Sequence, residues 1–511
     1  MTLIFEIALK GTHWATVLGC YALLAYLTFL GLRVVYNVYL HPLSSFPGPK
    51  LAAASNIPYA RAQIRGKLPQ WISAIHSTYN SSIVRISPNE LSFIGADAWK
   101  DIYSYRPGHI PFERDGRTYG KANNGVNTLL TAPKEDHARL RRVLDHAFSD
   151  RAFKEQVPAV KGHVDTLIRS LHEQVRGQYT GKVDVAKWYN WMSFDVIGDL
   201  SFGESFDCLK TQTYHPWVDM IFGNLTGIAI IGACNRFDIL QRLIPYFIPK
   251  RLIQMKHDHW AATVQTVNRR LELDTDRPDF MTPIIKHNNE KKGGLSRPEV
   301  VANMSLFIIA GSDSIATNLA GTTYYLLQNP EIMRKLNEEI DTSFTSEAQI
   351  TPESVSELPF MLACLAETSR IYPTGLSGQP MIVPPAGDLI CGQWVPGGTV
   401  VTINMLAAYR SPKNFTEPDA YRPERWLGDP RYAADDRSVL QPFSVGPRSC
   451  IGKNLGNLEV RLALARMIWN FEIKLSAETD PAWDDQLIFL AWAKKPLIIE
   501  LRAKEHSSMK S

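Results

Sequence analysis

The chain has 511 residues, of which 45% are hydrophobic and 21% are charged, the composition of a globular protein with an ample core. Its net charge of +4 is spread along the sequence without a basic run or an aromatic ladder, so nucleic-acid binding is not indicated. The six cysteines lack Cys-x-x-Cys spacing, which argues against a zinc site and against a dense disulfide framework.

The first element is a stretch without charged residues from Trp14 to Leu32, closed by Arg33. About 20 apolar residues span a bilayer, so residues 1–40 are predicted to form a membrane anchor with one transmembrane helix. A cleaved signal peptide is the alternative, but its apolar core is usually about 7–15 residues long, and a small-residue cleavage site follows it. The charge bias across the stretch is slight and only weakly places the rest of the chain in the cytosol.

Residues 41–50 contain Pro42, Pro47, Gly48 and Pro49, which cannot continue a helix. They predict a rigid, proline-rich hinge that would hold the body, residues 51–511, against the bilayer.

An unusually apolar stretch runs from Trp217 to Leu252 and is interrupted by Gly223, Gly227 and Gly232. Ordinary core helices are one interpretation. Glycines within an apolar stretch also suit a mobile lid, which is the other interpretation.

A long helix is predicted from the capping-box residues Ser296 and Glu299 to Leu327. About 30 residues at 1.5 Å each would span about 45 Å, enough to cross a domain. Its middle contains Gly311, which weakens a helix interior by roughly 1 kcal/mol relative to alanine. A residue without a side chain at this position would leave room beside a ligand.

A further helix, predicted from Pro359 to Tyr372, carries Glu367 and Arg370 on one face, since residues three apart are neighbours. A surface salt bridge is the conservative interpretation and would contribute little. Strand-like runs at 381–383, 389–391 and 399–403 predict small sheets between the helices.

The stretch 443–452, FSVGPRSCIG, predicts a loop that leads into an apolar-patterned helix over 453–471. Cys450 would then lie at a helix N-terminus, where unpaired N–H groups and the nearby Arg448 favour a thiolate. An isolated cysteine is more often a small buried hydrophobe. The surrounding residues reverse that expectation, because two glycines allow a flat ligand to approach the backbone and an arginine can pair with an anionic group.

The spacing Phe-x-x-Gly-x-Arg-x-Cys-x-Gly resembles the haem-binding loop of the cytochrome P-450 family, and the resemblance covers nearly the whole chain after residue 45. It implies a mostly α fold with small β-sheets and haem b buried between the long helix and the Cys450 loop. The implied activity is that of a haem-thiolate monooxygenase, which inserts one oxygen atom into an apolar small molecule by hydroxylation or epoxidation and reduces the other atom to water.

The resemblance also assigns residues to the haem. Cys450 would be the iron ligand, Phe443 would lie against the ligand-bearing loop, and Arg448 would bind a haem propionate. The remaining cofactor contacts would come from Gly446, Gly452, His137, Arg141, Ala310 and Gly311. The family often has tryptophan at the position of His137, so Arg141 is the better propionate candidate of the two.

Two further motifs follow the family pattern. Asp313 and Ser314 would relay protons to iron-bound dioxygen, although threonine is typical where this chain has Ser314. Glu367, Arg370 and Arg425 would form a buried network that braces the haem loop. Met381 stands about where many members place an arginine for a propionate, which leaves that contact in doubt.

The implied partners are the lipid bilayer and a separate NADPH–cytochrome P-450 reductase. A separate reductase is implied because no phosphate-cradling glycine motif or flavin domain follows the haem loop. Arg139 and Arg142, on other faces of the basic helix 136–144, would either be solvated or contact an acidic redox partner. Membrane-anchored relatives have this layout, which implies a single-pass protein of the endoplasmic reticulum whose catalytic domain faces the cytosol. The tract 119–121 and 124–126, together with the helix from His137 to Ser149, resembles filamentous-fungal members that modify terpenoid or polyketide secondary metabolites.

Two alternatives belong to other function classes. One is a thiolate-haem isomerase or dehydratase that needs no external electrons. The other is a haem-binding sensor or carrier without turnover, against which Asp313 and Ser314 argue, because a carrier does not need proton delivery.

Overall fold

The computed structural model describes residues 2–117, 120–176, 181–215, 225–273, 275–288 and 293–505, and for residues 2–16, 225 and 245 it describes the backbone only. Tyr119 of the tract 119–126 and residues 217–224 of the apolar stretch lie outside these residues.

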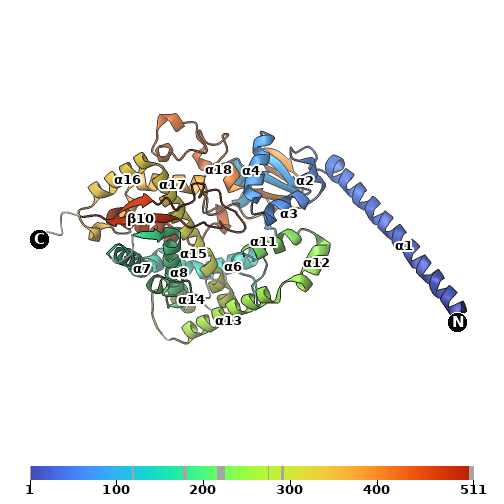
Figure 1. Cartoon of the computed structure of the whole chain (residues 1–511), viewed down its shortest axis with the longest axis horizontal. Helices are drawn as coiled ribbons and strands as arrows, with labels where there is room; N and C mark the ends of the chain where they lie inside the picture. Colours follow the sequence, from blue (N-terminus) through green and yellow to red (C-terminus); the bar gives the residue numbers. More distant parts are fainter. Residues whose placement is uncertain are drawn as a thin grey trace.

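The N-terminal helix projects away from the body of the protein (Figure 1). Helix α1 (Thr2–Val35) continues into a π-helical turn, η1 (Tyr36–Leu40). The stretch Val17–Leu40 contains an 18-residue window with a mean hydropathy of 1.8 in which no residue is buried, so it is a candidate membrane anchor. Among the described residues one other helix, Arg297–Gln328, is long and apolar enough to span a bilayer, but most of it is buried inside the protein.

The junction between the anchor and the body is fixed by backbone contacts. The Arg85 N–H donates to Pro47 O (2.7 Å), and Arg85 Nη1 donates to Asn37 O (2.8 Å). A side chain on Gly48 would clash with the Arg85 carbonyl, which explains the glycine between two prolines. These contacts attach the proline-rich segment to Arg85, and the rigid hinge stays a prediction.

Three small sheets accompany the helices. The largest has the strand order β1-β2-β8-β5-β3, with β2 and β8 parallel and the other pairs antiparallel; its strands are β1 (Ile83–Ser87), β2 (Glu90–Phe93), β8 (Val400–Ile403), β5 (Met381–Ile382) and β3 (Glu113–Arg114). The second has the order β4 (Lys182–Asp184), β10 (Ile498–Ala503) and β9 (Phe471–Leu475), and the third pairs β6 (Asp388–Ile390) with β7 (Gln393–Val395). The predicted strand-like runs are therefore confirmed.

Most of the body is helical. The principal helices are α2 (Lys50–Ala54), α3 (Ile57–Ile64), α4 (Leu68–Thr78), α5 (Asp97–Tyr103), α6 (Lys134–Leu144), α7 (Asp150–Arg176), α8 (Val185–Phe202), α9 (Cys208–Thr211), α11 (Leu225–Cys234), α12 (Asp238–Phe247), α13 (Lys250–Glu272), α14 (Met281–His287), α15 (Arg297–Gln328), α16 (Pro330–Ser343), α17 (Pro359–Ile371), α18 (Met405–Tyr409) and α19 (Lys453–Asn470). Helix α15 packs against both α8 and α19. The predicted capping box of α15 is present, because Ser296 N donates to Glu299 Oε2 at 2.8 Å.

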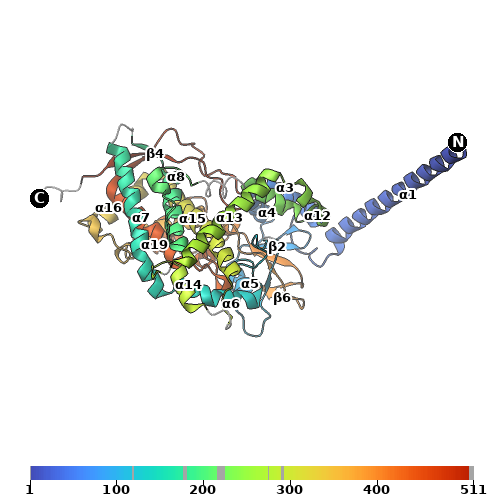
Figure 2. The same cartoon turned by 90° about the horizontal axis from the view of Figure 1, so that it is seen from below.

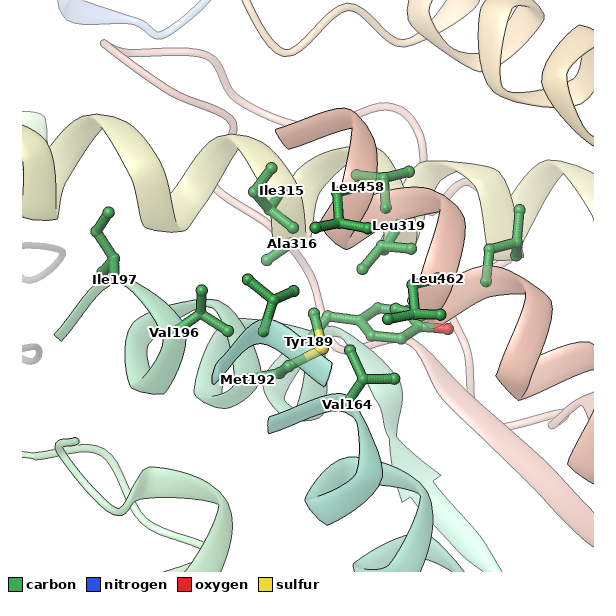
Figure 3. Close-up of a cluster of buried hydrophobic side chains, with 14 of the residues drawn as sticks. Val164, Tyr189, Met192, Val196, Ile197, Ile315, Ala316, Leu319, Leu458 and Leu462 are labelled. Atoms are coloured by element: carbon green, nitrogen blue, oxygen red, sulfur yellow. The ribbon is translucent and has the colours of Figure 1, made fainter. Parts of the chain in front are cut away.

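The core that positions the site lies where α15 crosses α8 and α19 (Figure 3). Leu319 and Leu462 are fully buried there, as is Met192 of α8. Burying a side chain of this kind stabilises the fold by about 1.5–3 kcal/mol. Glycines allow the close crossings: a Cβ on Gly456 would lie 3.2 Å from Ile315. Helix α15 is thus held firmly on both sides.

Candidate active site

The Cys450 loop closes on itself before α19 begins. The Cys450 N–H donates to Phe443 O at 2.8 Å. Gly446 has a φ of +75°, and a side chain on it would clash with the Tyr103 carbonyl, so only glycine fits. Gly452 is the N-cap residue of α19, and apart from its own chain neighbours no atom of the described residues lies within 4 Å of the position that its Cβ would take. The loop therefore presents Cys450 just before a helix, with open space beside Gly452.

The thiol of Cys450 is accessible, but desolvation by the protein around it raises its pKa. The N–H of Gly452 and the positive charges of Arg141 and Lys453 act in the opposite direction. The prediction that the helix N-terminus and Arg448 make the free side chain a thiolate is therefore wrong, since the cost of burying the charge outweighs these contributions. A coordinating metal ion deprotonates a thiol outright, whatever its pKa in the metal-free protein.

Basic side chains gather beside the loop. Arg448 donates from Nη2 to Ala132 O (2.9 Å), and its Nη1 is buried without a hydrogen-bond partner among the described residues. Arg141 donates from Nη1 to Ser449 O (2.7 Å) and from Nε to Asp145 (2.7 Å). Burial, together with the charges of Arg448, Arg141 and Arg114, lowers the pKa of His137 to about 4, so this imidazole is neutral near pH 7.

Arg114 is a member of this cluster that the sequence did not indicate. It lies on β3, directly opposite Met381 of β5, and its guanidinium nitrogens are buried. A guanidinium therefore lies beside Met381, where the sequence left a propionate contact in doubt. A two-residue strand has no periodicity, so no sequence signal could have paired these residues.

The middle of α15 has an accessible face within a mostly buried helix. Ile309 and Ala310 are exposed there, and Ser314 Oγ donates to Ala310 O at 3.1 Å. Gly311 does not face this open side: a Cβ on it would lie 2.6 Å from Ile197 Cδ1 of α8. The prediction that Gly311 leaves room for a ligand is therefore corrected, because its missing side chain allows α15 and α8 to pack.

Asp313 is held by two side chains, and neither of them is Ser314. Lys494 forms an ion pair with Asp313 Oδ1, and Thr317 Oγ1 lies 3.4 Å from Asp313 Oδ2. Lys494 Nζ also donates to Thr317 Oγ1 at 2.9 Å. Lys494 comes from the C-terminal segment before β10, and its distance in sequence from Asp313 explains why the motif did not reveal it.

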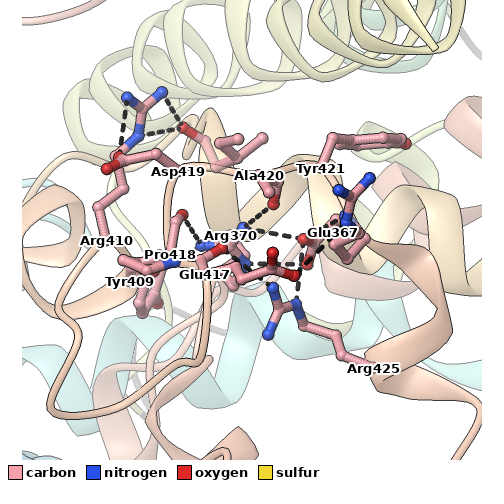
Figure 4. Close-up of polar contacts among 12 residues, drawn as sticks. Glu367, Arg370, Tyr409, Arg410, Glu417, Pro418, Asp419, Ala420, Tyr421 and Arg425 are labelled. Atoms are coloured by element: carbon pink, nitrogen blue, oxygen red, sulfur yellow. Dashed lines mark hydrogen bonds and ion pairs between the residues drawn. The ribbon is translucent and has the colours of Figure 1, made fainter. Parts of the chain in front are cut away.

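The predicted network of Glu367, Arg370 and Arg425 is assembled and completely buried (Figure 4). Arg370 donates to both carboxylate oxygens of Glu367 (2.9 and 2.8 Å), and Arg425 Nε donates to Oε1 at 3.1 Å. Arg370 Nη1 also donates to Tyr409 O (2.8 Å) and to Pro418 O (2.6 Å). The interpretation of Glu367 and Arg370 as a surface salt bridge is therefore wrong.

The basic face of α6 is already partly used within the protein. Arg139 pairs with Glu299 of α15 (2.5 Å) and Asp136 (3.2 Å), and it donates to Gly294 O (2.9 Å). Because these contacts tie α6 to the start of α15, Arg139 serves internal packing.

Comparison with known proteins identifies this arrangement. A family profile described as Cytochrome P-450 matches residues 74–501, more than half of the chain. The chain belongs to the cytochrome P-450 family. The predicted fold, mostly α with small β-sheets, is confirmed, and the family implies a haem iron, a redox partner and a small-molecule substrate.

Several fungal relatives are similar over nearly their whole length. The cytochrome P-450 monooxygenase atr2 of Stereocaulon alpinum is 42% identical over 470 residues, which are 92% of this chain and 92% of the relative. The monooxygenase lcsI of Purpureocillium lilacinum is 40% identical over 488 residues, 95% and 94% of the two chains. Averantin hydroxylase of Dothistroma septosporum is 41% identical over 471 residues, 92% and 88% of the two chains. This cytochrome P-450 is accordingly a haem-thiolate monooxygenase of secondary metabolism.

Proposed function

We propose that this cytochrome P-450 hydroxylates or epoxidises an apolar small molecule in fungal secondary metabolism, with electrons from a separate NADPH–cytochrome P-450 reductase that carries flavins. The observation that carries the proposal is the convergence of Arg114, His137, Arg141 and Arg448 beside the loop that presents Cys450. The hydroxylase activity named for the Dothistroma relative supports the reaction class.

The residues present fit haem b. Cys450 would ligate the iron, and the buried Nη1 of Arg448 has donor capacity that a propionate oxygen would satisfy. Arg114 and Arg141 would add charge to the same carboxylates, and neutral His137 would donate a hydrogen bond. Bound haem with a thiolate ligand supplies the activation of dioxygen, because the thiolate pushes electron density onto the iron and favours O–O cleavage.

The rest of the site would hold the haem in place from both sides. Phe443 would pack against the ligand-bearing loop, and Gly446 and Gly452 would let the backbone approach the ring. On the opposite side Ala310 would line the oxygen groove, with Gly311 acting through its contact with α8. Glu367, Arg370 and Arg425 would brace the segment that leads to the Cys450 loop.

Proton delivery is assigned to Asp313 and Ser314. The Asp313 carboxylate accepts from Lys494, and the Ser314 hydroxyl donates to Ala310 O. In our proposal Asp313 leaves Lys494, takes a proton from solvent water and passes it to the Ser314 hydroxyl, which rotates toward the groove and gives up its own proton there. Serine lacks the methyl group that restricts the threonine rotamer, so this rotation costs little.

The proposed location is the endoplasmic reticulum membrane, with α1 as the single-pass anchor and the body in the cytosol. Large apolar side chains on α12 support contact with the bilayer: Tyr246 is 82% exposed and Phe247 is 79% exposed. Both views place α12 at the end of the body from which α1 extends (Figures 1 and 2). An exposed apolar surface of this kind marks a membrane or protein contact.

The test is metabolite comparison between a fungal strain that lacks the protein and its parent, followed by incubation of the accumulated compound with microsomes containing the protein and reductase. We expect a product with one added oxygen atom that requires NADPH and dioxygen. A product that forms without either would instead support an isomerase or dehydratase. Haem binding without NADPH-dependent turnover of the accumulated compound would support a carrier.

A further inference from the structure

A series of aromatic rings runs through the body where α15, α17 and the segment between β9 and β10 meet. In order, the rings belong to Trp492, Tyr372, Trp483, Tyr324, Tyr325 and Tyr421. Neighbouring ring centres are 4.2, 5.5, 4.8, 5.3 and 5.3 Å apart, and all six residues are buried. We call these six residues the aromatic ladder. Each ring is close enough to the next to interact with it.

The Trp492 end of the aromatic ladder lies close to the candidate active site. Trp492 Nε1 donates to Pro373 O at 2.8 Å. Two residues further along the chain, a Cβ on Gly375 would lie 4.0 Å from the carbonyl oxygen of Pro442, which directly precedes the Cys450 loop. Trp492 is also only two residues before Lys494, the partner of the α15 carboxylate. The aromatic ladder therefore begins beside the segments that would enclose the haem.

Near its other end, the aromatic ladder has a group that can accept a proton. The Tyr325 hydroxyl donates to Asp484 Oδ2 at 3.0 Å, and Asp484 is partly exposed to solvent. Burial raises the pKa of Tyr325, and the Asp484 carboxylate raises it further, whereas Arg410 acts in the opposite direction. The phenol therefore keeps its proton near pH 7. When a tyrosine is oxidised it loses this proton, and an ionised carboxylate within hydrogen-bond distance can take it.

The composition of the aromatic ladder separates it from ordinary core packing. Aromatic pairs of this kind also stabilise a core without any further role. Packing alone does not require tryptophan or tyrosine at every position, because phenylalanine packs as well, yet all six members are of these two types. Tryptophan and tyrosine are the aromatic side chains that lose an electron most readily. An unbroken series of them, with a carboxylate at Tyr325, suits the transfer of electrons.

We propose that the aromatic ladder carries electrons from Tyr325 to the haem site when the haem has been oxidised by dioxygen or peroxide and no substrate is bound. In each event one electron moves along the ladder and the oxidised haem is reduced by one electron. Tyr325 is left as a neutral phenoxyl radical, and its proton passes to Asp484. An external one-electron reductant such as ascorbate then restores the phenol, and Asp484 returns the proton.

The consequence is protection of the haem site, because the oxidising equivalent leaves it before the haem or the residues around it are damaged. This inference goes beyond the proposed function. It needs the haem that the family implies, but it does not depend on which substrate is oxidised.

The experiment uses the full-length ferric holoprotein without substrate, mixed with hydrogen peroxide and frozen for electron paramagnetic resonance. Haem destruction is followed in parallel by the loss of Soret absorbance, with and without ascorbate. Tyr325→Phe removes the phenol and keeps the ring. Asp484→Asn keeps an acceptor oxygen but cannot take the proton, and because Asp484 is partly exposed it provides a second variant if Y325F folds poorly.

A matched control pair lies outside the aromatic ladder. The hydroxyl of Tyr432, which is also buried, donates to Glu417 Oε2 at 3.0 Å, and the guanidinium of Arg431 lies 5.4 Å from the centre of its ring. Tyr432→Phe and Glu417→Gln therefore remove the same kind of phenol and the same kind of carboxylate as the two test variants. Far-UV circular dichroism and the carbon monoxide spectrum establish that each variant is folded and holds haem.

We expect a tyrosyl radical in the parent and in both controls, its loss in Y325F and a weaker signal in D484N. Soret bleaching should be faster in Y325F and D484N than in the parent and the controls, and ascorbate should slow bleaching in the parent but not in Y325F. A parent without a tyrosyl radical would overturn the proposal, as would a signal of unchanged shape and intensity in Y325F. Equal loss of the signal in Y432F would also overturn it, because the effect would not belong to the ladder. A radical with the expected behaviour in a parent that does not turn over the accumulated compound would support the ladder and refute the proposed function.

Discussion

The buried network around Glu367 leads to a quantitative prediction for Glu367→Gln. The carboxylate accepts from Arg370 twice and from Arg425 once, and the Arg422 N–H (2.8 Å) and Trp426 Nε1 (2.9 Å) also donate to it. A glutamine removes the negative charge and points an NH₂ group at two or three of these donors, because each carboxylate oxygen accepts at least two of the hydrogen bonds. Breaking a buried charge pair by removing one partner costs about 3–5 kcal/mol.

This loss is a large part of the free energy of unfolding, because a folded domain is stable by only about 5–15 kcal/mol. We expect E367Q to lower the urea midpoint of the holoprotein by a corresponding amount at unchanged m-value, and to reduce the haem-bound fraction on expression. The matched control is Glu338→Gln, which breaks an exposed pair with Arg334 and should cost about 0–1 kcal/mol. A loss of stability in E367Q no greater than in E338Q would refute the reasoning.

Three further predictions follow from single side chains. Burial lowers the pKa of His76 from 6.5 to about 4. As the pH falls below 6.5, the imidazole is protonated in the unfolded chain before it is protonated in the folded protein, so the free energy of unfolding decreases. Between pH 7 and pH 5 this decrease should amount to about 2 kcal/mol and should be absent in His76→Gln, as measured by urea titration at both pH values. Gly446→Ala should yield no folded haem protein, because Gly446 has a φ of +75° and an added methyl group would clash with the Tyr103 carbonyl; normal expression with the parental Soret band would contradict this. Arg114→Met should release haem to apomyoglobin about tenfold faster than the parent, whereas an unchanged rate would exclude Arg114 from the propionate site.

The sequence predicted most of the elements that surround the site. The capping box at Ser296 and the apolar N-terminal stretch are local signals, and each is present in the fold as an element of the expected kind. The Glu367 network could be predicted because its members lie in two motifs that the family resemblance joined. The spacing from Phe443 to Gly452 identified the loop because its main features are local. Gly446 and the hydrogen bond from Cys450 N–H to Phe443 O both lie within ten consecutive residues.

What the sequence missed depends on contacts between distant segments. Lys494 pairs with Asp313 although the two residues are 181 positions apart in the sequence. Arg114 joins the basic cluster from a strand of only two residues. The role of Gly311 was misread for the same reason, since Ile197 comes from another helix. The thiol pKa was predicted in the wrong direction because the helix N-terminus is visible in the sequence, whereas the desolvation of Cys450 is not.

The most direct test of the central claim is the carbon monoxide difference spectrum of the reduced protein with Cys450 replaced by alanine. Thiolate ligation by Cys450 predicts a red-shifted carbon monoxide band in the parent and its loss in C450A, even in preparations in which far-UV circular dichroism shows an intact fold. If C450A keeps the red-shifted band, Cys450 is not the iron ligand, and the assignment of the site is wrong.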